Sequence, residues 1–285
     1  MDWIAEWKKL QDQSVLYRAV QRDQEESYWA KYALNYDDRR CWGNGLSKEL
    51  ETIRSLLDSS MSVLEIGAGT GALTLPTARI VKRVTAVEPS PSMIKVLEWK
   101  LERNGVDNVH TVNSRWEDAE VEPHDVVLAV GCLYVFYDIS DALGKMLEKA
   151  RKGLILTMGS PRQGQLYKEA ATVLRVSPPS MGPDFVHLYN VLCQLGIYAN
   201  VNIVRAKRSL LYENLEHAMD IRAERMELPE EKLPQLKDYL KRRLSVAPSG
   251  EFTLGEIEGV TAIIWHWKNG LPQFSFPMAD GETLS

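Results

Sequence analysis

The chain has 285 residues, 45% of them hydrophobic and 26% charged, a balance typical of folded globular proteins that excludes a wholly disordered or collagen-like chain. Lysine and arginine number 34 against 39 aspartate and glutamate residues, so the net charge of −5 gives no support to polyanion binding as the main function.

The apolar and cysteine patterns predict a cytoplasmic protein that does not associate with membranes. The longest apolar run, 126–137, is too short to cross a bilayer, and the N-terminal sequence lacks the apolar core of a secretory signal. Cys41, Cys132 and Cys193 are far apart and odd in number, so we expect neither a disulfide framework nor a metal site.

Residues 1–45 are predicted to form a helical N-terminal cap, since apolar residues recur there at helical spacing. The segment is rich in aromatic residues, namely Trp3, Trp7, Tyr17, Tyr28, Trp29, Tyr32, Tyr36 and Trp42. Two interpretations remain open at this stage. The aromatic residues are either simply buried against the fold or form a lid over a ligand.

Strands and helices alternate over residues 46–160, which predicts parallel βαβ units and a Rossmann-like, doubly wound sheet. Ser47 and Ser90 are expected to cap helices, the second with Pro91 at its first position and Gly105 at its close. Strands are expected at 62–66, 83–87, 109–112, 125–130 and 154–158, and further helices at 72–80 and 141–150. Ligands of such sheets bind at the carboxyl ends of the strands.

Residues 161–285 are predicted to complete a seven-stranded sheet. We expect strands at 201–205 and 260–267, and helices at 163–176, 185–195, 213–226 and 230–244. The inserted helices, within 209–250, are expected to lie near the ligand end of the sheet as a substrate cover.

A glycine-rich turn follows the first predicted strand. Gly67, Gly69 and Gly71 allow the backbone to turn sharply and to approach a ligand closely. The turn also fits a dinucleotide-binding fingerprint. Glu65 distinguishes the two types of site, because a carboxylate is unfavourable beside a pyrophosphate and favourable beside a cation. Glu88, which follows the second strand, suits ribose hydroxyls in either case.

The stretches VLEIGAGTGALT and VEPSPSMI resemble motifs I and II of the class I S-adenosylmethionine-dependent methyltransferases. Later stretches, among them SRWEDAE, are similar to an uncharacterised prokaryotic subgroup of that superfamily. The resemblance implies the methyltransferase fold, S-adenosylmethionine as cofactor, S-adenosylhomocysteine as product and no metal. The cofactor-contacting positions that it implies are Glu65, Gly67, Ala68, Gly69, Thr70, Gly71, Glu88, Pro89, Ser90, Met93, Arg115, Trp116, Glu117, Val130 and Gly131.

The chain departs from the family pattern after the third strand, where Arg115 takes the place of an aspartate that commonly meets the adenine amino group. Arg115 or Trp116 can instead stack on the adenine, or Trp116 can pack under the sheet edge. After the fourth strand, Gly131-Cys132-Leu133-Tyr134 is not the Asn/Asp-Pro-Pro-Tyr signature of amino-group methylation. Cys132 is placed well enough to approach a ligand, but the favoured interpretation is a small apolar residue that fills space.

The acceptor is predicted to be a small molecule rather than nucleic acid. The alternatives are an RNA or protein methyltransferase and a non-catalytic S-adenosylmethionine-binding protein. A general base is needed only if the acceptor must lose a proton. The candidates for such a base are Tyr28, Tyr36, Tyr134, Tyr137 and His187.

Overall fold

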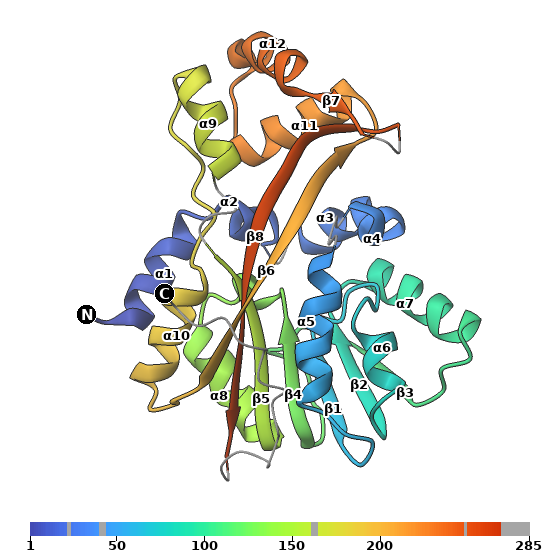
Figure 1. Ribbon diagram of the computed structural model, residues 1–285. Coiled ribbons are helices and arrows are strands. Elements are labelled where there is room, and N and C mark those ends of the chain that lie inside the picture. Colours follow the sequence, from blue (N-terminus) through green and yellow to red (C-terminus); the bar gives the residue numbers. More distant parts are fainter. Residues whose placement is uncertain (22–23, 40–43, 161–164, 248–249, 269–285) are drawn as a thin grey trace, which may run out of the picture.

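The described chain folds around one mixed β-sheet with helices on both faces (Figure 1). The computed structural model describes residues 1–21, 24–39, 44–160, 165–247 and 250–268. Trp42 and Cys41, which were singled out in the sequence, lie outside these residues. The strands are β1 (Ser62–Ile66), β2 (Arg83–Glu88), β3 (Val109–Asn113), β4 (His124–Val130), β5 (Ala150–Gly159), β6 (Asn200–Tyr212), β7 (Ser245–Val246) and β8 (Phe252–Trp267).

The strand order is β3-β2-β1-β4-β5-β8-β6. The first five strands of this order run parallel, and β8 is antiparallel to both β5 and β6. The order reverses between β1 and β4, which is where such sheets form a ligand crevice. The predicted seven-stranded, Rossmann-like sheet is thereby confirmed, with the two-residue β7 added beside β8.

Helices α6 (Thr74–Ala78), α7 (Pro91–Arg103) and α8 (Ile139–Lys149) connect parallel strands, and α5 (Asn44–Ser55) precedes β1. The predicted cap of α7 is confirmed, because the Ser90 hydroxyl accepts the backbone N–H of Met93. The predicted start of α5 at Ser47 is wrong, since that helix already begins at Asn44. Helix α6 is shorter than the predicted 72–80 because Ala72 still belongs to the turn after β1.

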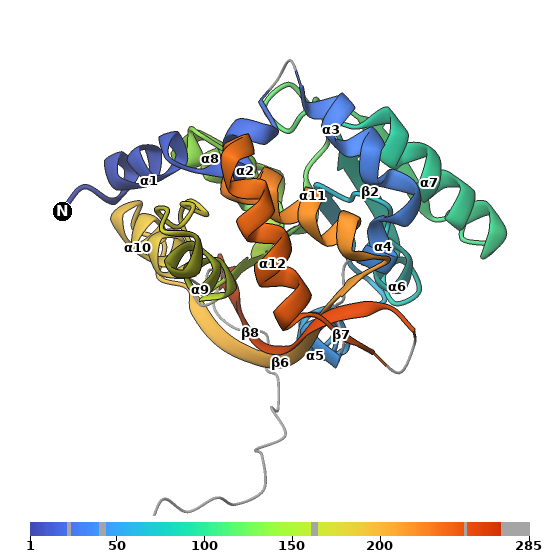
Figure 2. The same ribbon diagram turned by 90° about the horizontal axis from the view of Figure 1, so that it is seen from above.

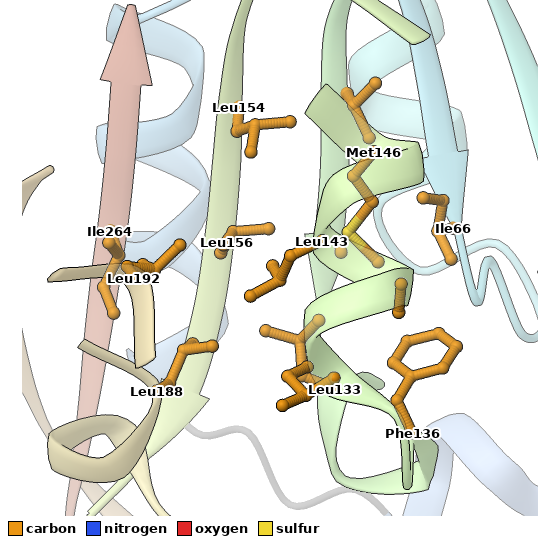
Figure 3. Close-up of a cluster of buried hydrophobic side chains, with 14 of the residues drawn as sticks. Ile66, Leu133, Phe136, Leu143, Met146, Leu154, Leu156, Leu188, Leu192 and Ile264 are labelled. Carbon is orange, nitrogen blue, oxygen red and sulfur yellow. The ribbon is translucent and has the colours of Figure 1, made fainter. Parts of the chain in front are cut away.

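The two faces of the sheet bury separate hydrophobic clusters. One cluster joins the sheet to α8, α1 (Trp3–Asp12) and α10 (Phe185–Gln194). Figure 3 shows part of it, with Leu143 and Met146 of α8 lying between Leu156 of β5 and Ile66 of β1. The second cluster joins the opposite face to α5 and α6. Burial on both faces explains why β4 is continuously apolar from Val126 to Val130 and why β1 is apolar except at Ser62 and Glu65.

Strands β6 and β8 extend beyond the sheet as a long antiparallel arm (Figure 1). The strands predicted at 201–205 and 260–267 are too short, because β6 continues to Tyr212 and β8 begins at Phe252. The predicted start of the helical insertion at residue 209 is therefore also wrong, since that residue still belongs to β6. The arm carries a second helical unit, which is distinct from residues 1–45 and is called the helical cap from here on. It consists of α9 (Gln165–Leu174), α11 (Leu215–Met226), the short helix η4 (Glu230–Lys232) and α12 (Leu233–Arg243).

The helical cap has its own hydrophobic core, formed by residues such as Leu174, Leu236 and Leu240. Figures 1 and 2 show α11 and α12 over the end of the sheet toward which β1 and β4 point. None of the helices in the described ranges is long and apolar enough to span a bilayer.

Four short N-terminal helices lie between the helical cap and the sheet. They are α2 (Val15–Ala19), α3 (Glu25–Tyr32), η1 (Ala33–Asn35) and α4 (Tyr36–Arg39). Polar contacts join them to α11: Arg18 pairs with Glu227 at 2.6 Å, and the Tyr32 hydroxyl donates to Glu224 at 3.2 Å. The N-terminal segment therefore contacts both the sheet side and the cap side of the molecule.

Candidate active site

A cavity lies where β1, β2 and β4 end, at the reversal of the strand order. Every position that the sequence predicted to contact a cofactor, apart from Gly71 and Ser90, lines this cavity. These residues are Glu65, Gly67, Ala68, Gly69, Thr70, Glu88, Pro89, Met93, Arg115, Trp116, Glu117, Val130 and Gly131. The N-terminal helices complete the wall with Glu25, Trp29 and Tyr36.

The turn after β1 requires glycine at Gly67. Its φ is +69°, a left-handed conformation that L side chains rarely adopt, and a Cβ there would lie 2.6 Å from the Cβ of Cys132. The backbone N–H groups of Gly67 and Ala68 both donate to the carbonyl of Val87, at 2.8 and 3.2 Å. The turn is thus fastened to the end of β2, and its backbone faces the cavity.

Glu65 is a buried carboxylate in the cavity wall. It is 3% exposed, and its Oε2 atom has no hydrogen-bond partner. Burial raises the pKa of Glu65 to about 7, and the nearby Glu88 adds to this effect. A carboxylate in this state lacks a counter-charge, which a cationic ligand in the cavity would supply.

Glu88 lies at the end of β2, where its two oxygens accept the backbone N–H groups of Gly69 at 2.9 Å and Ser90 at 3.0 Å. Burial raises its pKa to about 7, against the lowering effect of these hydrogen bonds. The two buried carboxylates, Glu65 and Glu88, give the cavity an acidic wall on the β1–β2 side.

The N-terminal segment is fastened over the cavity at three points. Glu26 accepts hydrogen bonds from the hydroxyls of Ser90 and Ser92, both at 2.5 Å. Asp37 accepts from the Thr70 hydroxyl at 2.6 Å and also pairs with Lys100. At the third point, Glu25 forms an ion pair with Arg115 at a distance of 3.4 Å.

Two residues predicted to contact cofactor lie outside the cavity wall. Gly71 packs against α7, since a Cβ added there would lie 2.4 Å from Leu97. The Ser90 hydroxyl caps α7 and donates to Glu26. Both positions support the walls of the site from behind.

A family model described as "Methyltransferase domain" matches residues 63–154, from β1 into β5. Together with the strand order and the cavity at the ends of β1, β2 and β4, this match identifies residues 63–154 as a methyltransferase-like domain. The described chain shares its fold with solved methyltransferase structures.

The chain is similar in sequence to part of a known methyltransferase. Ribosomal protein L11 methyltransferase of Acetivibrio thermocellus is 29% identical over 167 residues, which are 55% of this chain and 53% of that relative. The chain therefore spans about half the length of that relative.

Two solved structures share the fold at low identity. The YcgJ protein of Bacillus subtilis superposes with a TM-score of 0.53 at 16% identity, covering 79% of this chain and 98% of that chain. Magnesium protoporphyrin IX methyltransferase of Synechocystis with bound S-adenosylhomocysteine gives a TM-score of 0.52 at 13% identity, covering 86% and 99%.

The segment after β3 differs from the family pattern in a way that the structure explains. The Trp116 indole is 3% exposed, donates to the carbonyl of Ala142 at 3.1 Å and lies 4.7 Å from the Lys145 ammonium. Packing of Trp116 against α8 is thus the interpretation that the contacts support. Arg115 is held toward the N-terminal segment by Glu25.

The five candidate bases fall into two groups. Tyr36 and Tyr134 line the cavity, whereas Tyr28, Tyr137 and His187 do not. His187 completes a capping box with Asp184 at the start of α10, and Tyr137 stacks on Tyr17 and bonds Asp12.

Tyr28 accepts a hydrogen bond from Arg225 at 3.1 Å. Burial raises its pKa to about 12, so its phenol stays protonated at neutral pH. The role of Tyr28 as a base stays a prediction, and its side chain lies outside the wall of the cofactor cavity.

The space-filling interpretation of Cys132 agrees with its position. Its thiol donates to the carbonyl of Ile66 at 3.1 Å, and its Cβ occupies the space left open by Gly67. In the part of the chain with described side chains, no cluster of three or more histidine, cysteine, aspartate or glutamate residues can hold a metal ion.

Proposed function

We propose that this methyltransferase binds S-adenosylmethionine in the cavity and transfers its methyl group to a small-molecule acceptor. The observation that carries the proposal is the pair of buried carboxylates, Glu65 and Glu88, beside a glycine turn that only a bare backbone can form. A cofactor with a sulfonium and an ammonium group provides the positive charge that these carboxylates lack.

Each wall of the cavity suits a different part of the cofactor. The turn from Gly67 to Gly69 allows close approach of the methionine portion, with Glu65 facing its ammonium group. Glu88 is placed to accept the ribose hydroxyls, and Met93 offers an apolar surface for the adenine. These assignments are proposals that rest on the positions of the side chains in the cavity wall.

The bound cofactor would supply an activated methyl group, so the protein's task is to orient an acceptor and to exclude water. Orientation of two reactants can contribute about 7–11 kcal/mol to lowering a barrier. Trp29 and Tyr36 cover the cavity from the N-terminal side. Tyr36 and Tyr134 are the candidates to take a proton from the acceptor, if the acceptor carries one there.

We expect the affinity for S-adenosylmethionine to fall as the pH drops below about 7. The raised pKa values of Glu65 and Glu88, both about 7, mean that both carboxylates lose charge in this range. A cation stabilises their ionised forms, so binding at lower pH releases protons. Calorimetric titrations in buffers of different ionisation enthalpy measure this release, and an affinity that stays constant between about pH 6 and 8 would contradict it.

The small-molecule assignment is supported by the covered cavity and by the charge pattern. The helical cap and the N-terminal helices lie over the carboxyl ends of the strands (Figure 2). Basic residues of the arm and cap form ion pairs, such as Lys207 with Glu256 and Arg243 with Glu169. Nucleic-acid binding relies on basic groups that are free to replace counterions, so these pairs weigh against it.

A label-transfer experiment tests the proposal. The protein is incubated with methyl-labelled S-adenosylmethionine and a cell extract divided into small-molecule, RNA and protein fractions. We expect label only in the small-molecule fraction. Label in RNA or protein would favour a macromolecular acceptor, and cofactor binding without any transfer would favour a non-catalytic binding protein.

We also propose that residues 1–45 act as a lid over the cofactor, fastened by Glu26 and Asp37. Cofactor binding is then expected to slow tryptic cleavage at Lys31, which lies in α3 with 60% of its side chain exposed. Limited proteolysis with and without S-adenosylhomocysteine measures this. Cleavage at Lys237, on the distant cap helix α12, is the control and should not change, whereas equal rates at Lys31 would indicate a static segment.

A further inference from the structure

Helix α11 buries an arginine that has an unused hydrogen-bond donor. Arg222 is 2% exposed. Its Nε donates to the Tyr212 hydroxyl at 3.1 Å, and its guanidinium carbon lies 4.6 Å from the centre of the Tyr167 ring. Its Nη2 is buried and has no hydrogen-bond partner. A buried cation with an unsatisfied N–H group is costly, so its presence calls for an explanation.

Arg225 lies one turn further along α11, on the same side of the helix. Its Nη2 donates to the Tyr28 hydroxyl at 3.1 Å. It lines a cavity of about 300 Å³ between α11 and the N-terminal helices, together with Tyr28 and Gln24. Burial alone would lower the pKa of the Arg225 guanidinium, but surrounding tyrosines, Tyr134 among them, hold it above its usual value.

Neither arginine has an ion pair with a carboxylate among the residues that the structure describes. The acidic residues nearest in sequence, Glu224 and Glu227, also line this cavity but are engaged elsewhere. Glu224 contacts Lys31 and Tyr32, and Glu227 pairs with Arg18. Among the described residues, tyrosine side chains rather than carboxylates contact the two guanidinium groups.

A row of aromatic rings connects this space with the cofactor cavity. The Tyr28 ring, bonded to Arg225, lies 4.9 Å from Trp29, and Trp29 lies 6.0 Å from Tyr36. Trp29 and Tyr36 line the cofactor cavity. Tyr134 also lines that cavity and is close enough to Arg225 to affect its pKa. Arg225 thus adjoins, through Tyr28, the aromatic side of the site that includes Trp29.

We propose that Arg222 and Arg225 bind a carboxylate group of the methyl acceptor. Guanidinium groups form paired, charge-assisted hydrogen bonds with carboxylates. The inference rests on the proposed function, since it names the chemical class of the acceptor. The carboxylate is a binding group that orients the acceptor, while a different atom of the acceptor takes the methyl group.

Benzoate and its uncharged analogue benzamide are the probes for this site. Each is titrated into the full-length protein without cofactor, at constant ionic strength, and the thermal midpoint is recorded. We expect benzoate to raise the midpoint and benzamide to leave it unchanged. The Arg225→Gln variant should weaken benzoate binding at least about tenfold, the loss expected for one charge-assisted hydrogen bond. The Arg243→Gln variant, an exposed arginine of the same helical cap, should bind like the wild type.

The Arg222→Met variant separates binding from folding. Because its buried charge lacks a counter-ion, we expect this variant to melt no lower than the wild type and to lose benzoate binding. A lower melting point together with normal benzoate binding would show a structural arginine. Equal binding of benzoate and benzamide, binding of neither probe, or binding of inorganic phosphate in place of benzoate would each overturn the proposal.

Failure of the proposed function is measured separately. Titration of the same variants with S-adenosylhomocysteine should give wild-type affinity, because the arginines do not line the cofactor cavity. If the wild-type protein does not bind S-adenosylhomocysteine, the methyltransferase proposal is refuted, whatever the result with benzoate.

Discussion

We expect Gly67→Val to abolish cofactor binding and to lower the free energy of unfolding by about 2–5 kcal/mol. The left-handed conformation of Gly67 costs a residue with a side chain about 1–2 kcal/mol, and the collision of its new Cβ with Cys132 adds about 1–3 kcal/mol. The branched side chain would also enter the space that the cofactor occupies in the proposed complex. Chemical denaturation and calorimetric titration measure the two effects.

Gly144→Ala is the matched control for this substitution. Gly144 lies on the exposed side of α8, where an added Cβ meets nothing within 4 Å. Alanine is favoured over glycine inside a helix by about 1 kcal/mol, so this variant should be slightly more stable and should bind cofactor normally. If Gly67→Val bound S-adenosylhomocysteine as tightly as Gly144→Ala, the turn would not be the cofactor site.

Glu88→Gln is expected to weaken S-adenosylmethionine binding by about ten- to hundredfold while leaving the fold intact. A hydrogen bond to a charged group is worth about 1.5–3 kcal/mol, which corresponds to this factor. In the ligand-free protein, the buried charge of Glu88 is itself unfavourable, as its raised pKa indicates. Its removal should therefore cost little stability at neutral pH.

Glu102→Gln provides the comparison, because this residue is an exposed glutamate in the last turn of α7. Titration of both variants with S-adenosylmethionine gives the ratio of their affinities. The pH dependence of binding should be weaker in Glu88→Gln and unchanged in Glu102→Gln. An unchanged affinity in Glu88→Gln would place the ribose elsewhere in the cavity.

The parallel half of the sheet was predictable because its signals are local. Strands β1 and β4 are mostly apolar and buried on both faces, and α7 starts with a serine cap followed by proline. The arm was not predictable to its full length. Beyond the sheet β6 and β8 pair with each other and, near Phe252, with the short strand β7. Residues such as Lys207 therefore remain exposed, and the sequence of this segment is polar.

The site shows the same division between local and distant signals. Glu65, Gly67 and Glu88 directly adjoin strand ends, so sequence and topology together place them in one cavity. Glu25 and Asp37 were missed, because their partners Arg115 and Lys100 lie far along the chain and no periodic pattern connects them. The acidic pairs at 25–26 and 37–38 in an aromatic segment were the available signals.

The separate core of the helical cap has a consequence for how this protein can change. Residues such as Leu236 and Leu240 pack within the cap, while the cofactor cavity is built on the sheet. Substitutions in two regions without shared contacts have nearly additive effects on stability. The cap can therefore accumulate new side chains without a loss of stability in the sheet. In the proposed function, such changes could alter the preference for the acceptor while the sheet still binds the same methyl donor.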